Sequence, residues 1–121
     1  RAGRVGITGT NYKPLAKANQ IQKALQDLCD LINSKRNVLE KAFIALLLIA
    51  YIQPFEDGNK RTARILCNAL LLANKYCPIS FRTVDPDDYR YATLLFFEQN
   101  SLPSFKKMFI EQFEFSTANY F

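Results

Sequence analysis

The chain has 121 residues, of which 49% are hydrophobic, and this is enough to bury the core of one domain. Sixteen Lys and Arg against 11 Asp and Glu give a net charge of +5, which favours acidic partners such as phosphates, nucleotides or nucleic acid, although ordinary surface lysines give the same balance. Three cysteines without C-x-x-C spacing, in a chain that has no histidine, exclude the common zinc sites and indicate reduced thiols.

The front of the chain is rich in glycine. Residues 3–10 alternate small or polar side chains with β-branched ones and lead into a turn-forming stretch, Asn11 to Pro14. We expect an extended or hairpin segment here, with a frayed terminal strand as the alternative. The chain does not begin with Met, and its start lacks the charged-then-apolar pattern of a signal peptide. We therefore expect one domain over residues 1–121, cytoplasmic, cut from a longer chain.

Two amphipathic or buried helices follow the front segment. Apolar residues recur at spacings of three and four between Asn19 and Ser34, which predicts a helix capped by Asn19. Asn37 can cap the next helix, which becomes apolar on nearly every face from Ala42 to Ile52. That stretch is far shorter than the roughly 20 residues that span a bilayer, so we expect a buried helix and no membrane segment.

Three further helices are predicted, so the fold class is mainly all-α. One runs from Lys60 to Lys75 and is stopped by Pro78. Another is capped by Asp85, with proline in its first turn. The last extends over residues 104–120, and its aromatic stripe has the spacing of core residues rather than of a ligand site.

The stretch from Gln53 to Arg64 concentrates five charged residues between two apolar helices. Gly58 permits backbone conformations that other residues resist, and the helix that starts after it offers unpaired N–H groups. Arg61 and Arg64 lie one helical turn apart and could grip one polyphosphate from one side. Phosphate binding is one reading; a solvent-facing helix start is the alternative, equally compatible with the composition.

Asp57 supplies a hard oxygen ligand in the same stretch. A carboxylate beside a polyphosphate site is a common way of holding Mg²⁺, with phosphate oxygens and water completing its shell. The predicted phosphate-binding residues are Gly58, Asn59, Lys60, Arg61 and Arg64.

The sequence from Gln53 to Arg64 resembles the signature of the Fic family, which runs His-x-Phe-x-Asp/Glu-Gly-Asn-Gly-Arg-x-x-Arg between two buried helices. The matching residues, in order and spacing, are Phe55, Asp57, Gly58, Asn59, Arg61 and Arg64. Two positions depart: Gln53 stands in the place of the histidine, and Lys60 replaces the second glycine, as in many Fic and Doc proteins.

The front segment is similar to the β-hairpin flap that precedes the Fic core and docks a target protein by strand addition. The resemblance therefore covers essentially the whole chain and implies a Fic-like helical bundle with a short hairpin flap over about residues 4–14. The implied docking residues are Gly6, Ile7, Thr8, Gly9 and Thr10.

The resemblance implies a protein adenylyltransferase that transfers AMP from ATP to a protein hydroxyl. It places magnesium on Asp57, the α- and β-phosphates on Gly58 and Asn59, and the γ-phosphate on Arg64, with Arg61 neutralising the phosphates. Phe55 is expected to anchor the loop in the core. The family also implies an inhibitory helix or an antitoxin partner, for which this sequence carries no motif.

Gln53 is the difficulty, because a glutamine amide cannot take a proton from the attacking hydroxyl. We expect ATP binding with lost or much reduced AMP transfer. Three explanations stay open: a nucleotide-binding pseudoenzyme, a nearby carboxylate such as Glu56 acting as base, or a deliberate replacement of the histidine. Two other function classes are a protein-interaction module and a basic helical module that binds nucleic acid. The acids interleaved with the basic residues argue against nucleic acid.

Overall fold

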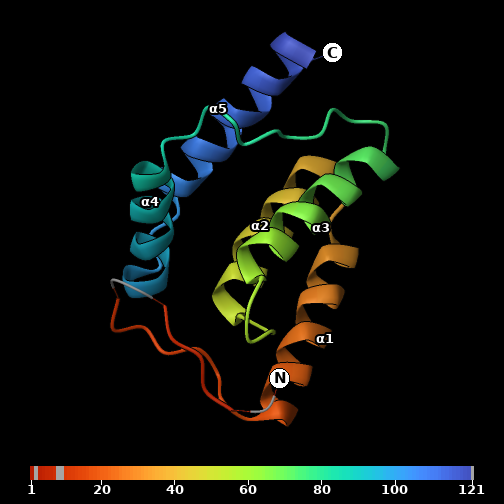
Figure 1. Ribbon diagram of the computed structural model, residues 1–121. Helices are drawn as coiled ribbons and strands as arrows, with labels where there is room; N and C mark the ends of the chain where they lie inside the picture. Colours follow the sequence, from red (N-terminus) through yellow and green to blue (C-terminus); the bar gives the residue numbers. More distant parts are fainter. Residues whose placement is uncertain (2, 8–9, 121) are drawn as a thin grey trace.

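The structure, a computed structural model, describes residues 1, 3–7 and 10–120, without the side chain of Tyr120. Within this range an extended front segment leads into helices only, in the order α1 (Ala18–Ser34), α2 (Val38–Ile52), α3 (Asn59–Ala73), α4 (Pro86–Gln99) and α5 (Pro103–Tyr120). Helices α1, α2 and α3 lie side by side, whereas α4 and α5 form a second group joined to α3 by a long connector (Figure 1). The predicted all-α class is confirmed for the described residues.

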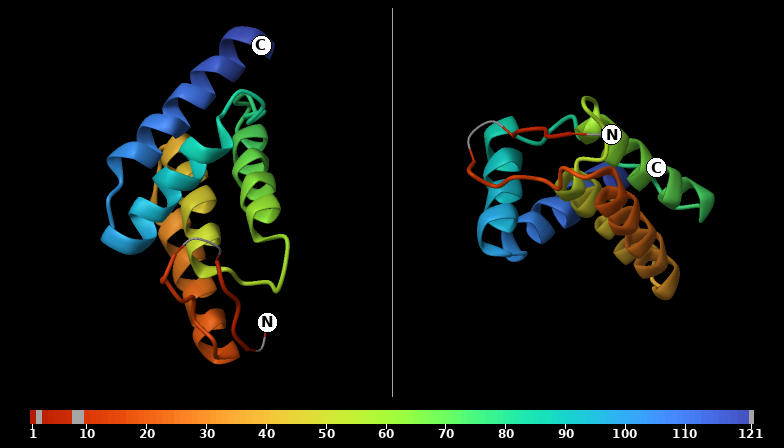
Figure 2. Two further views of the ribbon diagram at one scale, coloured as in Figure 1. Left: turned by 60° about the vertical axis from the view of Figure 1, so that its left-hand side comes forward. Right: turned by 90° about the horizontal axis from the view of Figure 1, so that it is seen from below.

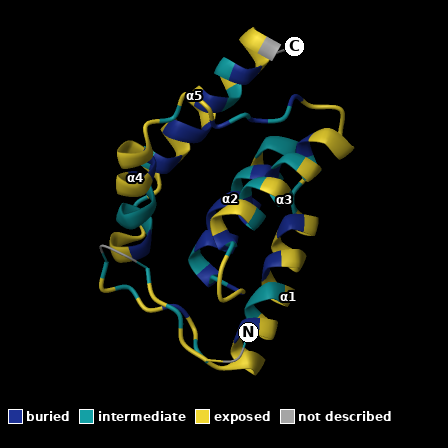
Figure 3. Ribbon diagram, viewed as in Figure 1, coloured by how far each residue is buried: buried dark blue, intermediate teal, exposed yellow. Residues whose placement is uncertain are grey.

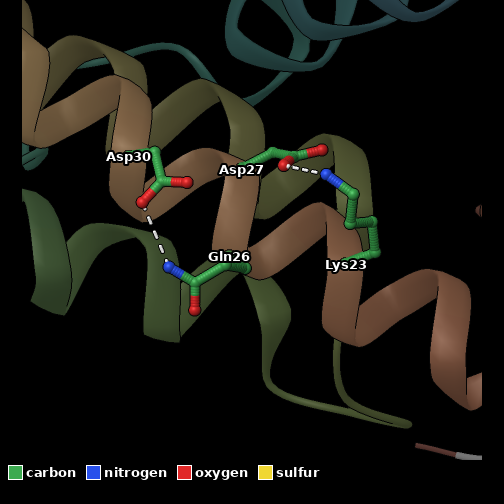
Figure 4. Close-up of polar contacts among 4 residues, drawn as sticks. All are labelled: Lys23, Gln26, Asp27 and Asp30. Atoms are coloured by element: carbon green, nitrogen blue, oxygen red, sulfur yellow. Dashed lines mark hydrogen bonds and ion pairs between the residues drawn. The ribbon is translucent and has the colours of Figure 1, made fainter.

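Helix α1 covers the core with one face only. Ile21, Leu28 and Ile32 are buried, in agreement with the predicted periodicity. Its outer face carries polar contacts one turn apart, such as the ion pair from Lys23 Nζ to Asp27 Oδ1 at 2.6 Å (Figure 4). The predicted cap was wrong, because the helix already begins at Ala18 and Asn19 lies inside its first turn.

Helix α2 is the centre of the core (Figure 3). Asn37 caps it as predicted, since its side chain accepts a hydrogen bond of 3.1 Å from the Glu40 N–H. Ala42 and Ala45 are fully buried, and small side chains of this kind allow neighbouring helices to approach closely. Phe43 makes edge-on ring contacts with two phenylalanines of α5, which joins the two helical groups. No described helix combines the length and apolar character that crossing a membrane requires.

The end of α3 differs from the prediction. The helix stops at Ala73, where the Tyr76 N–H donates to the Leu71 carbonyl (2.8 Å) and the Lys75 N–H to the Leu72 carbonyl (3.0 Å). Together with the left-handed backbone of Lys75 (φ 62°), these bonds form a Schellman motif. The helix is therefore closed by its own carbonyls and not by Pro78.

Helix α4 begins as predicted. The Asp85 side chain accepts hydrogen bonds from the N–H groups of Asp87 (2.7 Å) and Asp88 (3.3 Å), with Pro86 in the first turn. The aromatic stripe of α5 is structural at Phe105 and Phe109, which are buried among α2 and α4. These contacts position Tyr89, on the first turn of α4, facing the core.

The front segment is extended, but the predicted β-hairpin is wrong for its described part, because residues 3–7 and 10–17 contain no strand. The Gly3 N–H does donate to the Ala16 carbonyl (3.0 Å), but no ladder continues from that bond in the described residues. Side chains hold the segment instead: Tyr12 stacks on Tyr51 of α2 at a ring separation of 4.6 Å. The segment thus crosses the ends of α2 and α4 (Figure 2).

Candidate functional site

The loop between α2 and α3 is bounded by two residues in left-handed conformation. Gln53 directly follows α2 with φ 52°, and its N–H donates to the Ile49 carbonyl at 3.0 Å. Gly58 directly precedes α3 with φ 80°. A Cβ on Gly58 would also lie 3.0 Å from Arg61 Nη2, the tip of a flexible side chain that would have to shift, so glycine is favoured here mainly by the backbone.

Asn59 holds this loop from inside. It is 5% exposed, and its Oδ1 accepts from the Phe55 N–H (2.8 Å) while its Nδ2 donates to the Phe55 carbonyl (2.7 Å) and to Gln53 Oε1 (2.9 Å). The side chain is therefore committed to the loop. Any contact of Asn59 with a phosphate would have to use its backbone N–H.

Gln53, at the position of the motif histidine, is fixed at both ends of its amide. Its Nε2 donates to the Ala50 carbonyl at 2.6 Å, and its Oε1 accepts from Asn59. One of these hydrogen bonds joins the partly buried Gln53 side chain to the last turn of α2, and the other joins it to the first residue of α3. Its chemistry at this position is structural hydrogen bonding, since an amide does not titrate.

Phe55 does not anchor the loop in the core as predicted. Its ring is 49% exposed, whereas its backbone is gripped by Asn59. Pro54 is the loop residue that is buried. The prediction failed because the left-handed Gln53 turns the chain so that the neighbouring Pro54, and not the aromatic ring, faces inward.

The first turn of α3 offers unpaired N–H groups. The Gly58 N–H is used by Asp57 Oδ1 at 2.8 Å, but those of Asn59, Lys60 and Arg61 have no acceptor in the described part of the chain. No acidic residue lies in this first turn to offset their partial positive charge. An anion is the natural partner for such a helix start when it also carries cations.

Three cations surround this helix start: Lys60, Arg61 and Arg64. None of them forms an ion pair with a carboxylate among the described residues. The Arg64 guanidinium instead lies over two rings, 4.6 Å from the centre of Phe81 and 4.8 Å from that of Tyr89. Lys60 Nζ lies 5.0 Å from the same Tyr89 ring. These side chains keep their charge without a counter-charge.

The ionisation of this group follows from its surroundings. Lys60 is largely exposed as a residue, but desolvation of its ammonium, followed by the Arg64 charge, lowers its pKa. Burial raises the pKa of the Tyr89 hydroxyl, and Arg64 opposes the rise. The contact that Tyr89 offers to Lys60 and Arg64 is the face of its ring.

A cavity of about 630 Å³ opens over this loop, within the range of small-molecule sites. The predicted motif residues that line it are Gln53, Asp57, Gly58, Asn59, Lys60, Arg61 and Arg64, together with Glu56 and Ile65. Gly6 and Ile7 of the front segment also line it. Thr10 lies elsewhere, donating to Glu98 at 2.5 Å, and Thr8 and Gly9 are outside the described residues.

Arg1 is a positioning residue that the sequence did not reveal. Its guanidinium donates to the Gln53 carbonyl (2.5 Å), the Ile52 carbonyl (3.2 Å) and the Leu15 carbonyl (2.6 Å). It thereby ties the front segment to the C-terminal end of α2, where carbonyls lack helical partners. No spacing rule predicts such a contact, because its acceptors are backbone atoms 14 to 52 residues away.

Comparison with protein families identifies the chain's family. The model described as "Fic/DOC family" matches residues 4–71, which include the front segment, the loop and most of α3. The matched range therefore contains every residue that we assigned to the candidate site from the sequence.

Curated relatives carry related names. The chain is 43% identical over 51 residues to "Protein adenylyltransferase Fic" of Nematostella vectensis, covering 42% of this chain and 12% of that protein. It is 27% identical over 126 residues to "Protein adenylyltransferase fic-1" of Caenorhabditis elegans, covering 98% of this chain and 24% of that protein. The chain thus spans about a quarter or less of the length of these two relatives.

Among solved structures, the BepC protein of Bartonella tribocorum, crystallised with bound AMPPNP, has a similar fold. The TM-score is 0.76 at 21% sequence identity, covering 93% of this chain and 56% of that one. The likeness supports the arrangement of the helices.

Proposed function

Because this chain belongs to the Fic/DOC family, we propose that it binds ATP with magnesium over the start of α3, and that Gln53 leaves AMP transfer to a protein hydroxyl slow or absent. The observation that carries ATP binding is the set of unpaired N–H groups and uncompensated cations around one cavity. The adenylyltransferase names of the curated relatives, and the AMPPNP held by BepC, support the choice of ATP as the anion.

Each side chain has a role in this proposal. The backbone N–H groups of Asn59 and Lys60 donate to phosphate oxygens at the helix start. The tight turn at Gly58 leaves room for the phosphates there. Arg61 and Arg64 neutralise the phosphates, with Arg64 on the terminal one. Lys60 adds a third charge from the position where the motif commonly has glycine.

Asp57 suits magnesium in this arrangement. It is exposed and lines the cavity, and one of its oxygens is held by the Gly58 N–H at 2.8 Å, which orients the carboxylate. One such carboxylate is enough for Mg²⁺, which is usually held by one or two carboxylates with phosphate oxygens and water. The ion would neutralise phosphate charge when bound.

Gln53 is the reason for proposing impaired transfer. The target hydroxyl must lose its proton as its oxygen bonds to the α-phosphorus and pyrophosphate leaves, and the Gln53 amide is already hydrogen-bonded at both ends. General-base assistance is worth about 10²- to 10⁴-fold in rate. Arg61 and Arg64 would still position the phosphates and neutralise their charge. Any residual rate would come from this positioning and electrostatic stabilisation.

Calorimetric titration with ATP and MgCl₂ tests the binding proposal. We expect saturable heat for the unmodified chain, and at least tenfold weaker binding for Arg61→Ala. The matched control is Arg36→Ala, which removes an exposed arginine that does not line the cavity. Absence of heat at near-millimolar ATP would overturn the proposal.

Labelled ATP tests the role of position 53. Gln53→His should gain auto-AMPylation or target AMPylation over the unmodified chain. If the unmodified chain already labels at a comparable rate, transfer is not impaired, and Glu56→Gln then asks whether that carboxylate, which lines the cavity, serves as base.

The front segment supports a further part of the proposal, the docking of a target protein. Within the described residues, no hydrogen bond uses the backbone groups of residues 4–7, and Gly6 and Ile7 line the cavity. Free N–H and C=O groups beside the nucleotide site can receive an extended peptide by backbone pairing. A Val5→Pro variant, at a residue that does not line the cavity, should lose target labelling in the Gln53→His background while its ATP affinity stays unchanged.

A further inference from the structure

Two aromatic residues outside the motif contact its last arginine. Phe81 lies in the connector after α3, and Tyr89 lies on α4. Their rings meet edge to face, 6.4 Å apart at 79°, and the Arg64 guanidinium lies over both of them. The connector and α4 thus each contribute a ring to one side chain of α3.

The two rings form a rigid support. Phe81 is 8% exposed and Tyr89 is 4% exposed, and the Tyr89 ring also meets the fully buried Phe105 at 5.8 Å. Phe81 has a left-handed backbone (φ 58°), a conformation that a bulky residue keeps only where its surroundings impose it. Neither ring can move without disturbing the core.

The support leaves the charge of Arg64 intact. A carboxylate partner would also fix the guanidinium, but it would compete with any incoming anion for the same donors. A ring face attracts the cation through its quadrupole and brings no net charge. The buried Arg64 Nε has no hydrogen-bond partner in the described residues, which agrees with a side chain held by stacking. Lys60 shares the Tyr89 ring.

We propose that Phe81 and Tyr89 are positioning residues of the nucleotide site, which hold Arg64, and through Tyr89 also Lys60, toward the cavity so that their charges remain available to the phosphates. This inference rests on the proposed function for its ligand. The support itself is a property of the protein without nucleotide, and the two can be tested apart.

The first test uses no nucleotide. In the ¹⁵N relaxation of the Arg64 Nε–H group, we expect an order parameter near that of rigid backbone, about 0.8, falling below about 0.6 in Tyr89→Leu. Tyr89→Phe keeps the ring and should keep the order. The matched control is Phe97→Leu, which removes another buried α4 aromatic that contacts Tyr12 and Tyr51 instead of the cations. A mobile Arg64 in the unmodified protein would overturn the inference.

The second test is MgATP affinity by calorimetry. Tyr89→Leu and Phe81→Leu should each weaken binding by about 3- to 30-fold, the range expected for a lost cation–ring contact, whereas Tyr89→Phe and Phe97→Leu stay within about twofold. In an Arg64→Ala background, Phe81→Leu should have no further effect, because Phe81 acts only through that arginine.

The outcomes separate the two proposals. If the unmodified chain binds no MgATP, the proposed function is wrong, and the relaxation measurement still decides whether the rings hold Arg64. If the chain binds MgATP but Phe81→Leu matches Phe97→Leu, or its effect persists without Arg64, the inference alone is wrong. A fall for Tyr89→Phe as large as for Tyr89→Leu would assign the effect to the hydroxyl and also overturn it. Should Tyr89→Leu fail to fold, Phe81→Leu decides by the same criteria.

Discussion

The amide of Asn59 donates a 2.9 Å hydrogen bond to the side-chain carbonyl of Gln53. The residue that follows α2 and the residue that begins α3 are thereby joined, and the loop between them is closed around its own polar atoms. The residue at the position of the motif histidine thus belongs to the frame of the proposed phosphate site. If that proposal holds, a change at this contact should alter both stability and ligand binding.

Asn59→Ala should destabilise the protein markedly. It removes three hydrogen bonds from a 5% exposed residue and leaves the Phe55 N–H and the Gln53 Oε1 unpaired, so we expect a loss of about 2–4 kcal/mol in the free energy of unfolding. Urea denaturation measures it. Asn33→Ala, an exposed change on α1, is the control and should cost less than about 0.5 kcal/mol. Equal midpoints for the two variants would contradict the role given to Asn59.

Gly58→Ala should lower both stability and ATP affinity. The left-handed backbone (φ 80°) disfavours a Cβ, and that atom would lie 3.0 Å from Arg61 Nη2, so we expect a cost of about 1–2 kcal/mol. Thermal unfolding checks the stability change. Gly6→Ala is the matched control, because its Cβ meets nothing within 4 Å. A Gly58→Ala protein as stable as Gly6→Ala would show that the turn tolerates side chains.

The three cysteines should differ sharply in reactivity. Cys29 is exposed on α1, whereas Cys67 and Cys77 are buried, and burial raises the pKa of Cys67 to about 12. Because the thiolate is the reactive form, a disulfide reagent at pH 8 should label Cys29 quickly and the other two only after unfolding. Cys29→Ser should abolish the fast phase. Fast labelling of two thiols in the folded protein would contradict the burial of Cys67 on α3 or of Cys77 in the connector after it.

Tyr12 should make stability fall at high pH. Burial, and then the neighbouring Tyr51, raise the pKa of Tyr12 above its ordinary value of 10.0. Above pH 10 the unfolded chain releases this proton while the folded chain retains it, so the free energy of unfolding decreases as pH rises. Tyr12→Phe should be less stable at pH 7, having lost the 2.8 Å bond to the Tyr51 carbonyl, but the gap should narrow above pH 10.

Urea midpoints between pH 7 and 11 measure this narrowing. Tyr91→Phe removes a hydroxyl from an exposed residue and serves as the control for general alkaline effects. A gap between Tyr12→Phe and the unmodified protein that stays constant over this range would mean that Tyr12 ionises equally in both states.

Local rules predicted most of the fold. Apolar periodicity predicted the helices, and the side-chain caps predicted at Asn37 and Asp85 are confirmed. The end of α3 was not predictable in the same way, because Lys75 adopts a left-handed conformation that usually signals glycine. The hairpin predicted at the front failed because side-chain contacts, such as Tyr12 on Tyr51, and not strand pairing, hold that segment.

The candidate site divides in a similar way. The motif residues between Asp57 and Arg64 line one cavity, because a loop and the first turns of the following helix are close together in sequence. The supports of that site are not local: Arg1 reaches it across 52 residues, and Tyr89 comes from another helix. Tyr89 is buried as a core residue, and no motif spacing indicates that Lys60 and Arg64 lie over its ring.

Some charged side chains of this protein form ion pairs and others do not, so stability and ligand binding should respond differently to ionic strength. Ion pairs such as those from Lys23 to Asp27 and from Lys107 to Glu111 lie exposed on helix surfaces and add little to stability. Lys60, Arg61 and Arg64 form no ion pair among the described residues, and in the proposed function they meet the phosphates. Added electrolyte should then screen the attraction between these cations and a nucleotide while hardly altering the temperature at which the helices unfold. On the proposed function, raising the salt concentration should therefore release the ligand from an intact fold.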